Sequence, residues 1–184
     1  MTGIDAPLGR LTPGDPPVLE YERRFPHPVE KVWKAITGRE HLRAWFPCDI
    51  IGERRAGADV QAPFWPEVTA KMGFEDPGLT GRILVWDPPR VFEWLWSTDT
   101  LRFELTPDGT DTVLRLTVQV VDLTAGVVDT AAGYQVCLTH LRQVLDTGAA
   151  PSVIDTDPQE FVSAYAEAFD LPPGGATSGS DDHD

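Results

Sequence analysis

The sequence contains few cysteines and no long apolar run. Its two cysteines, Cys48 and Cys137, lie far apart and lack the CxxC spacing, so we expect two buried, reduced thiols. No stretch approaches the roughly 18 consecutive apolar residues of a membrane-spanning helix. The N-terminus has no basic start followed by an apolar run. We therefore expect a cytoplasmic protein with no segment inserted in a membrane.

Basic residues are also scarce. Lys and Arg number 15 against 29 Asp and Glu, giving a formal net charge of −14. A field of this sign repels the phosphates of nucleic acids and the surface of anionic membranes. Residues 151–184 hold eight of the acidic residues and no Lys or Arg, so much of the acidity belongs to the C-terminal end. We expect no nucleic acid among the partners.

Known catalytic and metal-binding motifs are missing. The sequence has no HExxH or GxSxG motif, no Walker loop and no glycine-rich dinucleotide motif. We expect His140 on the wetter side of a helix and His183 in a tail, both at the surface. No catalytic residue, metal or cofactor is assigned.

A long amphipathic helix is predicted over residues 127–145. Its apolar residues recur at steps of three and four, which places them on one stripe of an α-helix. Between them, Asp129, Gln135 and His140 fall mostly away from the stripe, so that face is expected to meet solvent. The stripe consists of Val127, Ala131, Tyr134, Leu138, Leu141 and Leu145.

Residues before this helix alternate with period two, the pattern of half-buried strands. A first strand is predicted at 19–25, followed by two short helices, one after Pro28 and one over residues 39–45. Short links between the later segments favour antiparallel hairpins. The longest break, 66–78, is expected to be a mobile loop. The later strands are predicted near 48–53, 58–65, 79–86, 90–97, 100–106 and 112–121.

The two ends differ in composition from the middle. Residues 1–17 are rich in proline and glycine, which predicts a flexible arm, and 18–148 are expected to form the domain. Residues 149–171 are interpreted as a linker plus a short C-terminal helix. Residues 172–184 are expected to be a disordered acidic tail.

Aromatic side chains gather on the predicted inner faces. They could form a dense core or line a ligand pocket, and both roles need the same residues. Tyr134 combines a ring for the wall with a hydroxyl for a directed hydrogen bond. Arg23, on the inner row of the first strand, could form a salt bridge at the rim or anchor a ligand. The candidate ligand-binding residues are Trp33, Phe64, Trp65, Trp86, Trp94, Trp96, Phe103, Tyr134 and Leu138.

Three segments carry a family resemblance: LEYERRFPHPVEKVWKAITGREHLRAWF, GLTGRILVWDPPRVFEWLW and FELTPDGTDTVLRLTVQ. Their order resembles the START-like superfamily (SRPBCC, polyketide cyclase/lipid transport), and more narrowly its branch of activator of heat-shock-protein ATPase homologues, over about 19–146. Two positions depart from that branch. Arg55-Ala56-Gly57 stands where a Gly-Gly pair is common, and Gly133-Tyr134 where Gly-Trp is common, so ligand identity is not carried over.

The resemblance implies an α+β helix-grip fold: a curved antiparallel sheet of six to seven strands around a long C-terminal helix, with a cavity between them. Members of the superfamily hold lipids, hormones or polyketides there, and some catalyse cyclisation or hydrolysis. Our first hypothesis is binding of a small hydrophobic or aromatic molecule without catalysis. One alternative is a cyclase- or hydrolase-type enzyme that uses Tyr134 on a hydrophobic carbonyl compound. Another is a co-chaperone-like interaction module that binds a chaperone or forms a homodimer.

Overall fold

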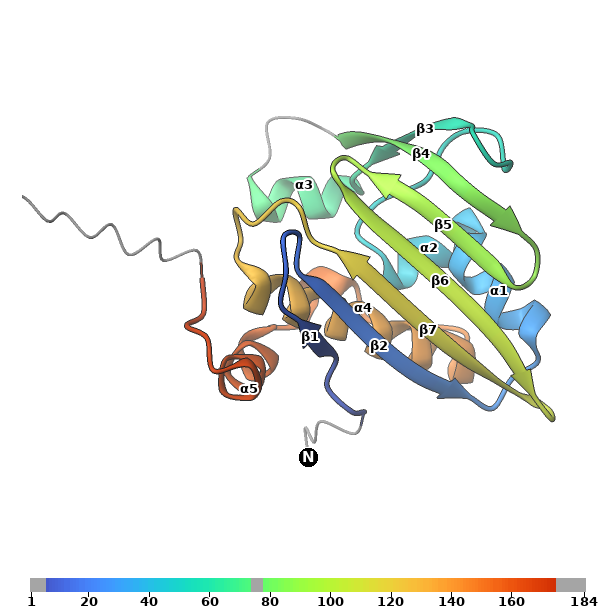
Figure 1. Ribbon diagram of the computed structural model, residues 1–184. Coiled ribbons are helices and arrows are strands. Elements are labelled where there is room, and N and C mark those ends of the chain that lie inside the picture. Colours follow the sequence, from blue (N-terminus) through green and yellow to red (C-terminus); the bar gives the residue numbers. More distant parts are fainter. Residues whose placement is uncertain (1–5, 74–77, 175–184) are drawn as a thin grey trace, which may run out of the picture.

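A computed structural model describes residues 6–73 and 78–174. Seven antiparallel strands form one sheet in the order β1-β2-β7-β6-β5-β4-β3. Figure 1 shows this sheet in front of the helices. The strands are β1 (Arg10–Thr12), β2 (Val18–Phe25), β3 (Asp59–Pro63), β4 (Gly78–Asp87), β5 (Val91–Trp96), β6 (Asp99–Asp108) and β7 (Asp111–Gln119).

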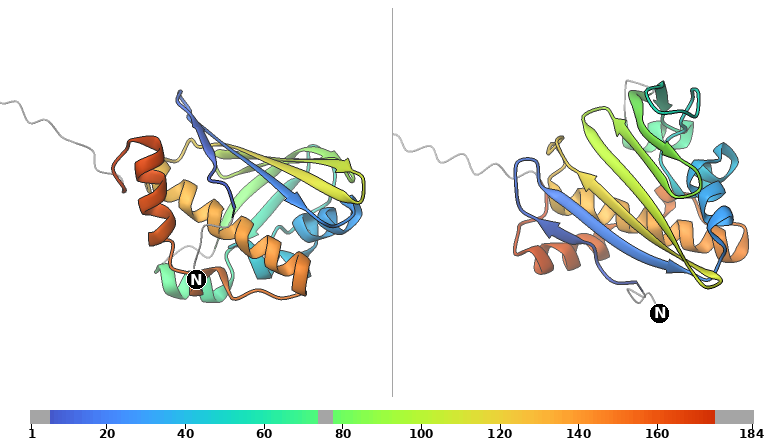
Figure 2. Two further views of the ribbon diagram at one scale, coloured as in Figure 1. Left: turned by 90° about the horizontal axis from the view of Figure 1, so that it is seen from below. Right: turned by 45° about the vertical axis from the view of Figure 1, so that its right-hand side comes forward.

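The helices pack on the inner face of the sheet. Figure 2 shows α4 running beneath the strands, with α5 beside it. Because strand side chains alternate between faces, the inner row of each strand is apolar and is buried against the helices. The helices are α1 (Val29–Thr37), α2 (Arg39–Trp45), α3 (Pro66–Met72), α4 (Val127–Thr147) and α5 (Gln159–Phe169), and a short 3₁₀ turn spans Val153–Asp155. The predicted α+β helix-grip fold is confirmed.

Helix α4 is buried on more sides than the stripe predicts. Gln135 and His140, expected on the wet face, are only 1% and 2% exposed. The reason is tertiary, because α2 and α5 pack on flanks that the stripe leaves open. The prediction of a surface histidine at position 140 was therefore wrong.

The segment 66–78 was expected to be a loop, but most of it is helical. Pro66 occupies the first turn of α3, where its missing N–H costs no hydrogen bond. Gly73 ends the helix in a left-handed conformation, with φ of 68°. Residues 74–77 lie outside the described residues.

The predicted strand at 48–53 is not a regular strand. Only isolated pairs connect this segment to its neighbours, Cys48 with Phe64 and Ile51 with Gln61. Here the chain leaves α2 and turns into β3, which allows single backbone contacts without a continuous ladder.

Both predicted terminal segments hold elements that pack on the domain. Within the expected flexible arm 1–17, β1 pairs with β2. Beyond residue 148, α5 buries Tyr165 completely, and its hydroxyl accepts a hydrogen bond from the Gly9 backbone N–H. The expected boundaries at 18 and 148 thus leave out β1 and α5. Most of the predicted tail, 175–184, lies outside the described residues.

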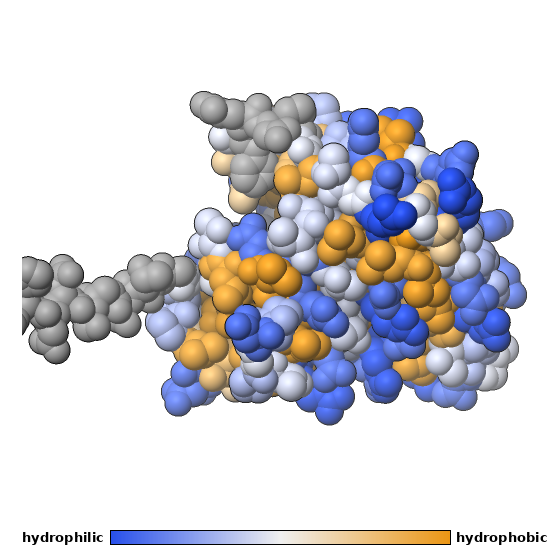
Figure 3. All heavy atoms as spheres, turned by 45° about the horizontal axis from the view of Figure 1, so that its top comes forward, coloured by the Kyte–Doolittle hydropathy of each residue, from blue (hydrophilic) through white to orange (hydrophobic). Residues whose placement is uncertain are grey.

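The outer face of the sheet is charged. Arg102 pairs there with Glu93 at 2.6 Å and with Glu104 at 3.0 Å. A hollow of about 170 Å³ lies on this face, lined by Glu104, Thr106, Val113 and Arg115. Figure 3 shows hydrophobic patches separated by hydrophilic residues on the side of the molecule that faces the viewer. This hollow is separate from the predicted ligand site, which lies on the inner face.

Candidate ligand-binding site

The centre of the candidate site is a row of three aromatic side chains on β5. Phe92, Trp94 and Trp96 are two residues apart, so all three point to the inner face. The rings of Phe92 and Trp94 are 6.2 Å apart and nearly parallel, at 6°. Those of Trp94 and Trp96 are 5.8 Å apart at 23°. The strand geometry therefore builds a continuous aromatic surface that faces the helices.

Two further rings cover the Trp96 end of this row. The ring of Phe46, which follows α2, has its centre 6.2 Å from the ring centre of Trp94 and 5.3 Å from that of Trp96. Phe64, which follows β3, lies 6.1 Å from Trp96. Phe46 and Phe64 lie outside the named strands, and Phe64 pairs with Cys48 in an isolated bridge.

Two polar atoms in this apolar region lack a partner. The indole nitrogens of Trp94 and Trp96 are buried, and no described residue accepts a hydrogen bond from either. By contrast, Trp45 donates to the Ala35 carbonyl and Trp65 to the Phe46 carbonyl, each at 2.8 Å. The fold thus pairs the indoles of Trp45 and Trp65 and leaves the two on β5 unpaired.

Tyr134 of α4 is buried as well, being only 7% exposed. Burial raises its pKa well above the usual value, and the nearby Asp99 carboxylate and the Cys137 and Cys48 thiols raise it further. The phenol therefore keeps its proton at neutral pH and can donate a hydrogen bond, but it cannot serve as a base. In the described part of the chain its hydroxyl has no hydrogen-bond partner, so the titratable partner that the cyclase- or hydrolase-type hypothesis requires is not found there.

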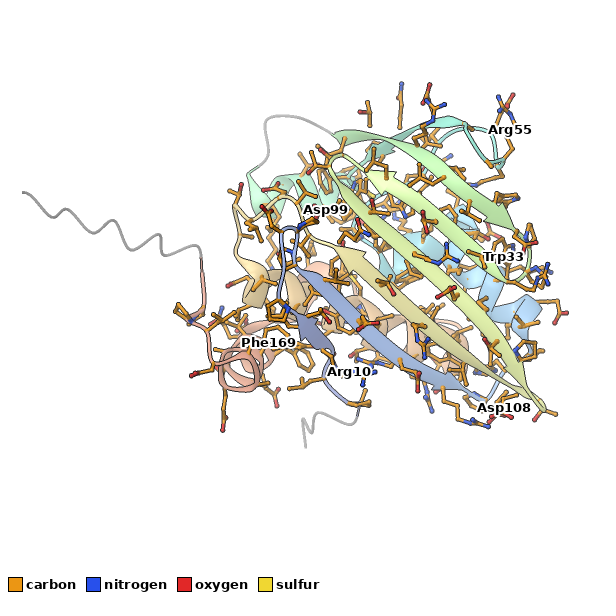
Figure 4. All side chains as sticks on the ribbon, viewed as in Figure 1. Arg10, Trp33, Arg55, Asp99, Asp108 and Phe169 are labelled. Atoms are coloured by element: carbon orange, nitrogen blue, oxygen red, sulfur yellow. The ribbon has the colours of Figure 1, made fainter. Side chains whose placement is uncertain are left out.

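Asp99 begins β6, directly across from Trp96 of β5. Burial raises the pKa of its carboxyl, although the N–H groups of Val121 and Asp122 donate to Oδ1 at 2.7 and 2.9 Å and oppose the rise. Figure 4 places Asp99 and Trp33 at opposite ends of the sheet. The Trp96 end of the row therefore has a carboxylate near it.

The other predicted residues join the same apolar cluster at different places. Trp33 contacts Trp86 at 5.1 Å, at the Phe92 end of the row. Phe103 stacks on Phe92 at 6.0 Å. Leu138 is buried in α4. Trp65 is in the cluster as well, but its ring faces the Arg43 guanidinium at 5.5 Å and its indole donates to the Phe46 carbonyl.

Sequence reasoning missed three residues of this region as site residues: Phe46, Asp99 and Cys137. Phe46 directly follows the short helix predicted over 39–45, and nothing in the sequence indicated that it would meet the β5 row. Asp99 lies between the strands predicted near 90–97 and 100–106. The register that places it opposite Trp96 is a property of the folded hairpin.

Arg23 lies in a second buried polar cluster, away from the aromatic row. Its guanidinium donates to the Glu22 carbonyl and to the Gln135 side chain, each at 2.8 Å, and Tyr165 donates to the same Gln135 oxygen at 2.7 Å. Burial lowers the pKa of Arg23. Within the described residues no carboxylate lies within 4.0 Å of it, so the salt bridge considered for it is not seen. The cluster attaches α5 to α4 and β2.

The interaction-module hypothesis assigns partner binding to the helix predicted at 157–170 or to the acidic tail. Tyr165 of α5 packs in the core, so this helix is also a structural part of the domain. Among residues 6–73 and 78–174 there is no cluster of side chains suited to a metal ion, and no helix long and apolar enough to cross a membrane.

With this geometry established, comparison with known proteins decides the family. The family model described as activator of Hsp90 ATPase homolog 1-like protein matches residues 26–146. The chain belongs to this family. The family predicted from the sequence motifs is confirmed, and all candidate ligand-binding residues lie within the matched range. The match begins after β2 and ends before α5.

Solved structures of similar fold come from several bacteria. A conserved protein of unknown function, EF2215 from Enterococcus faecalis, is 19% identical, with coverage of 88% of this chain and 90% of that one and a TM-score of 0.72. CalU16 from Micromonospora echinospora is 21% identical, with coverage of 87% and 93% and a TM-score of 0.60. The Aha1 dimer from Colwellia psychrerythraea is 20% identical, with coverage of 71% and 97% and a TM-score of 0.54. None of the curated proteins compared with the chain matches it. At these identities the likeness shows the fold alone.

Proposed function

We propose that this chain binds a small hydrophobic or aromatic molecule between the inner face of the sheet and α4. The observation that supports it is the pair of buried, unpaired indole N–H groups of Trp94 and Trp96. Leaving a buried donor unpaired costs about 1–3 kcal/mol. Two such donors lie in one apolar region of this fold. A ligand with a hydrogen-bond acceptor could pair with them where the protein offers no acceptor.

The occupied state requires rearrangement, because the rings on β5 contact Phe46 and Phe64. We propose that the ligand enters at the Trp96 end by displacing Phe46, whose loop lies outside the sheet ladder. The aromatic surface left behind, from Trp96 to Phe92, would then stack against a flat guest.

The test uses the full chain, purified from its own host and analysed by native mass spectrometry. We expect one small molecule retained per chain and released on unfolding. In parallel, the neutral dye N-phenyl-1-naphthylamine should bind saturably, and Trp96→Leu should weaken its binding about tenfold, since stacking on an aromatic ring contributes about 0.5–1.5 kcal/mol. Leu84→Ala, at an exposed position of β4, is the control and should leave binding unchanged. No retained molecule and no saturable dye binding would contradict the proposal.

A chaperone or a second copy of this chain stays a predicted alternative partner. It is supported by the family and by the solved dimer of the Colwellia protein. A location in the cytoplasm also stays a prediction.

A further inference from the structure

We propose that the ligand is a neutral aromatic molecule carrying a hydrogen-bond acceptor, such as a ketone, quinone or lactone carbonyl, which receives the indole N–H groups of Trp94 and Trp96. This inference rests on the proposed function and adds the chemical class of the guest. Two observations support this inference: the unpaired indole donors of the site and the ionisable groups around it.

The first step concerns the donors. An indole nitrogen can only donate, so the missing partner must be an acceptor. Elsewhere the fold supplies that acceptor itself, as the carbonyls of Ala35 and Phe46 do for Trp45 and Trp65. Around the indoles of β5 the contacting side chains are the rings of Phe46 and Phe92, which carry no oxygen. A guest with a carbonyl would supply one.

The second step concerns charge. The ionisable group across from Trp96 is the Asp99 carboxyl, which disfavours a second carboxylate nearby. Burial lowers the pKa of two arginines. Arg23 donates to Gln135 and lies on β2, three strands away from β5. Arg54 donates through Nη2 to the carbonyls of Thr37 and Ile50, and its buried Nη1 has no partner among the described residues. The site therefore favours a neutral acceptor over an anionic one.

The experiment compares three probes of similar size: 1-acetonaphthone with a ketone, 1-naphthoate with a carboxylate, and 1-ethylnaphthalene with no acceptor. Affinities come from titrations followed by intrinsic fluorescence and checked by calorimetry. We expect the ketone to bind about tenfold more tightly than the hydrocarbon, because its carbonyl accepts one hydrogen bond from each of the two indoles. We expect the carboxylate to bind most weakly of the three.

A second readout observes the donors directly. With ¹⁵N-labelled tryptophan, each indole N–H gives its own NMR signal, and Trp94→Phe and Trp96→Phe identify the two of interest. The ketone should move both signals downfield, and the hydrocarbon should not produce that downfield movement. The signal of Trp45 serves as the internal control and should not move downfield, because its indole already donates to the Ala35 carbonyl. The signal of Trp65 is not used as a control, since its acceptor belongs to Phe46. The measurement on the unaltered chain keeps the test valid if Trp94→Phe does not fold.

The outcomes separate the two proposals. Equal affinity for ketone and hydrocarbon, unmoved signals of Trp94 and Trp96, or tightest binding of the carboxylate would each overturn the ligand class while leaving hydrophobic binding intact. Binding of none of the three probes would overturn the proposed function as well. In Trp96→Phe, the advantage of the ketone should shrink while the affinity for the hydrocarbon stays within about twofold.

Discussion

At the scale of single residues, tryptophans whose indole nitrogens are all buried differ in what those nitrogens contact. Trp45 and Trp65 donate to backbone carbonyls, whereas Trp94 and Trp96 have no acceptor among the described residues. Nothing in the local sequence distinguishes the two pairs, since all four were expected in apolar surroundings. The difference arises from which backbone segment passes by each ring after folding.

His140 gives a prediction at the same scale. Burial lowers its pKa, although the carbonyls of Pro151 and Ala44 and the carboxylate of Asp155 oppose this, and its Nε2 lies 2.8 Å from the Thr156 hydroxyl. A histidine with a lowered pKa in the folded state stabilises the fold above its unfolded pKa of about 6.5, and that contribution is lost as the pH falls. We therefore expect the unfolding free energy to drop between pH 7.5 and pH 5, and His140→Gln to remove part of the drop.

Urea unfolding followed by tryptophan fluorescence at the two pH values measures this effect. His41→Gln, at a more exposed position on α2, is the matched control and should keep the drop of the unaltered chain. The same pH dependence in all three proteins would refute a role for His140.

At the scale of elements, a glycine of α4 and a glycine of β4 differ in the space around them. Gly133 is exposed in the middle of α4, and a Cβ added there would meet nothing within 4 Å. Gly81 of β4 is closely packed, and a Cβ there would lie 2.3 Å from the Leu95 carbonyl oxygen. Gly133 therefore lowers the stability of α4 and has no packing role. Gly81, by contrast, allows β4 and β5 to approach each other closely.

Gly133→Ala should therefore stabilise the chain by about 0.5–1 kcal/mol, because alanine restricts the unfolded backbone and favours the helix. Gly81→Ala should destabilise it by about 1–3 kcal/mol through overpacking between β4 and β5. Urea unfolding of both variants under one condition gives the comparison. A stability gain from Gly81→Ala, or a loss from Gly133→Ala, would run against the structure.

Two of the features that prediction missed share one physical cause. Strand β1 and the burial of α5 depend on contacts with distant parts of the chain: β1 needs β2, and Tyr165 needs Gly9 and Gln135. Segments with strong internal periodicity, such as α4 and the hairpins from β4 to β7, were predicted within a few residues. Their signal lies in their own sequence, since one face of each is apolar.

At the scale of the whole molecule, the two thiols report on global folding. Cys48 and Cys137 are buried and unpaired, as predicted. Burial raises the pKa of Cys137 to about 12 and that of Cys48 well above its usual value. Both therefore remain thiols at neutral pH, and reagents reach them only when the structure opens.

We expect an aromatic disulfide reagent at pH 8 to label the native chain at least about a hundredfold more slowly than the unfolded chain. Ser163→Cys, at an exposed position of α5, provides a fast-reacting control. Both native thiols should become reactive together as urea unfolds the chain. Rapid native labelling of either one would show that its part of the core opens independently.

The sequence by itself determined the fold class, the family and the apolar faces of most strands and of α4, because periodicity and turn residues act locally. It also determined which aromatic residues would lie inside. Only the tertiary structure decided how those residues meet: which indoles find an acceptor, which carboxylate faces Trp96, and why His140 and Gln135 are buried. These depend on register and on packing between distant segments, where the geometry of the folded chain, and not the order of its residues, sets the distances.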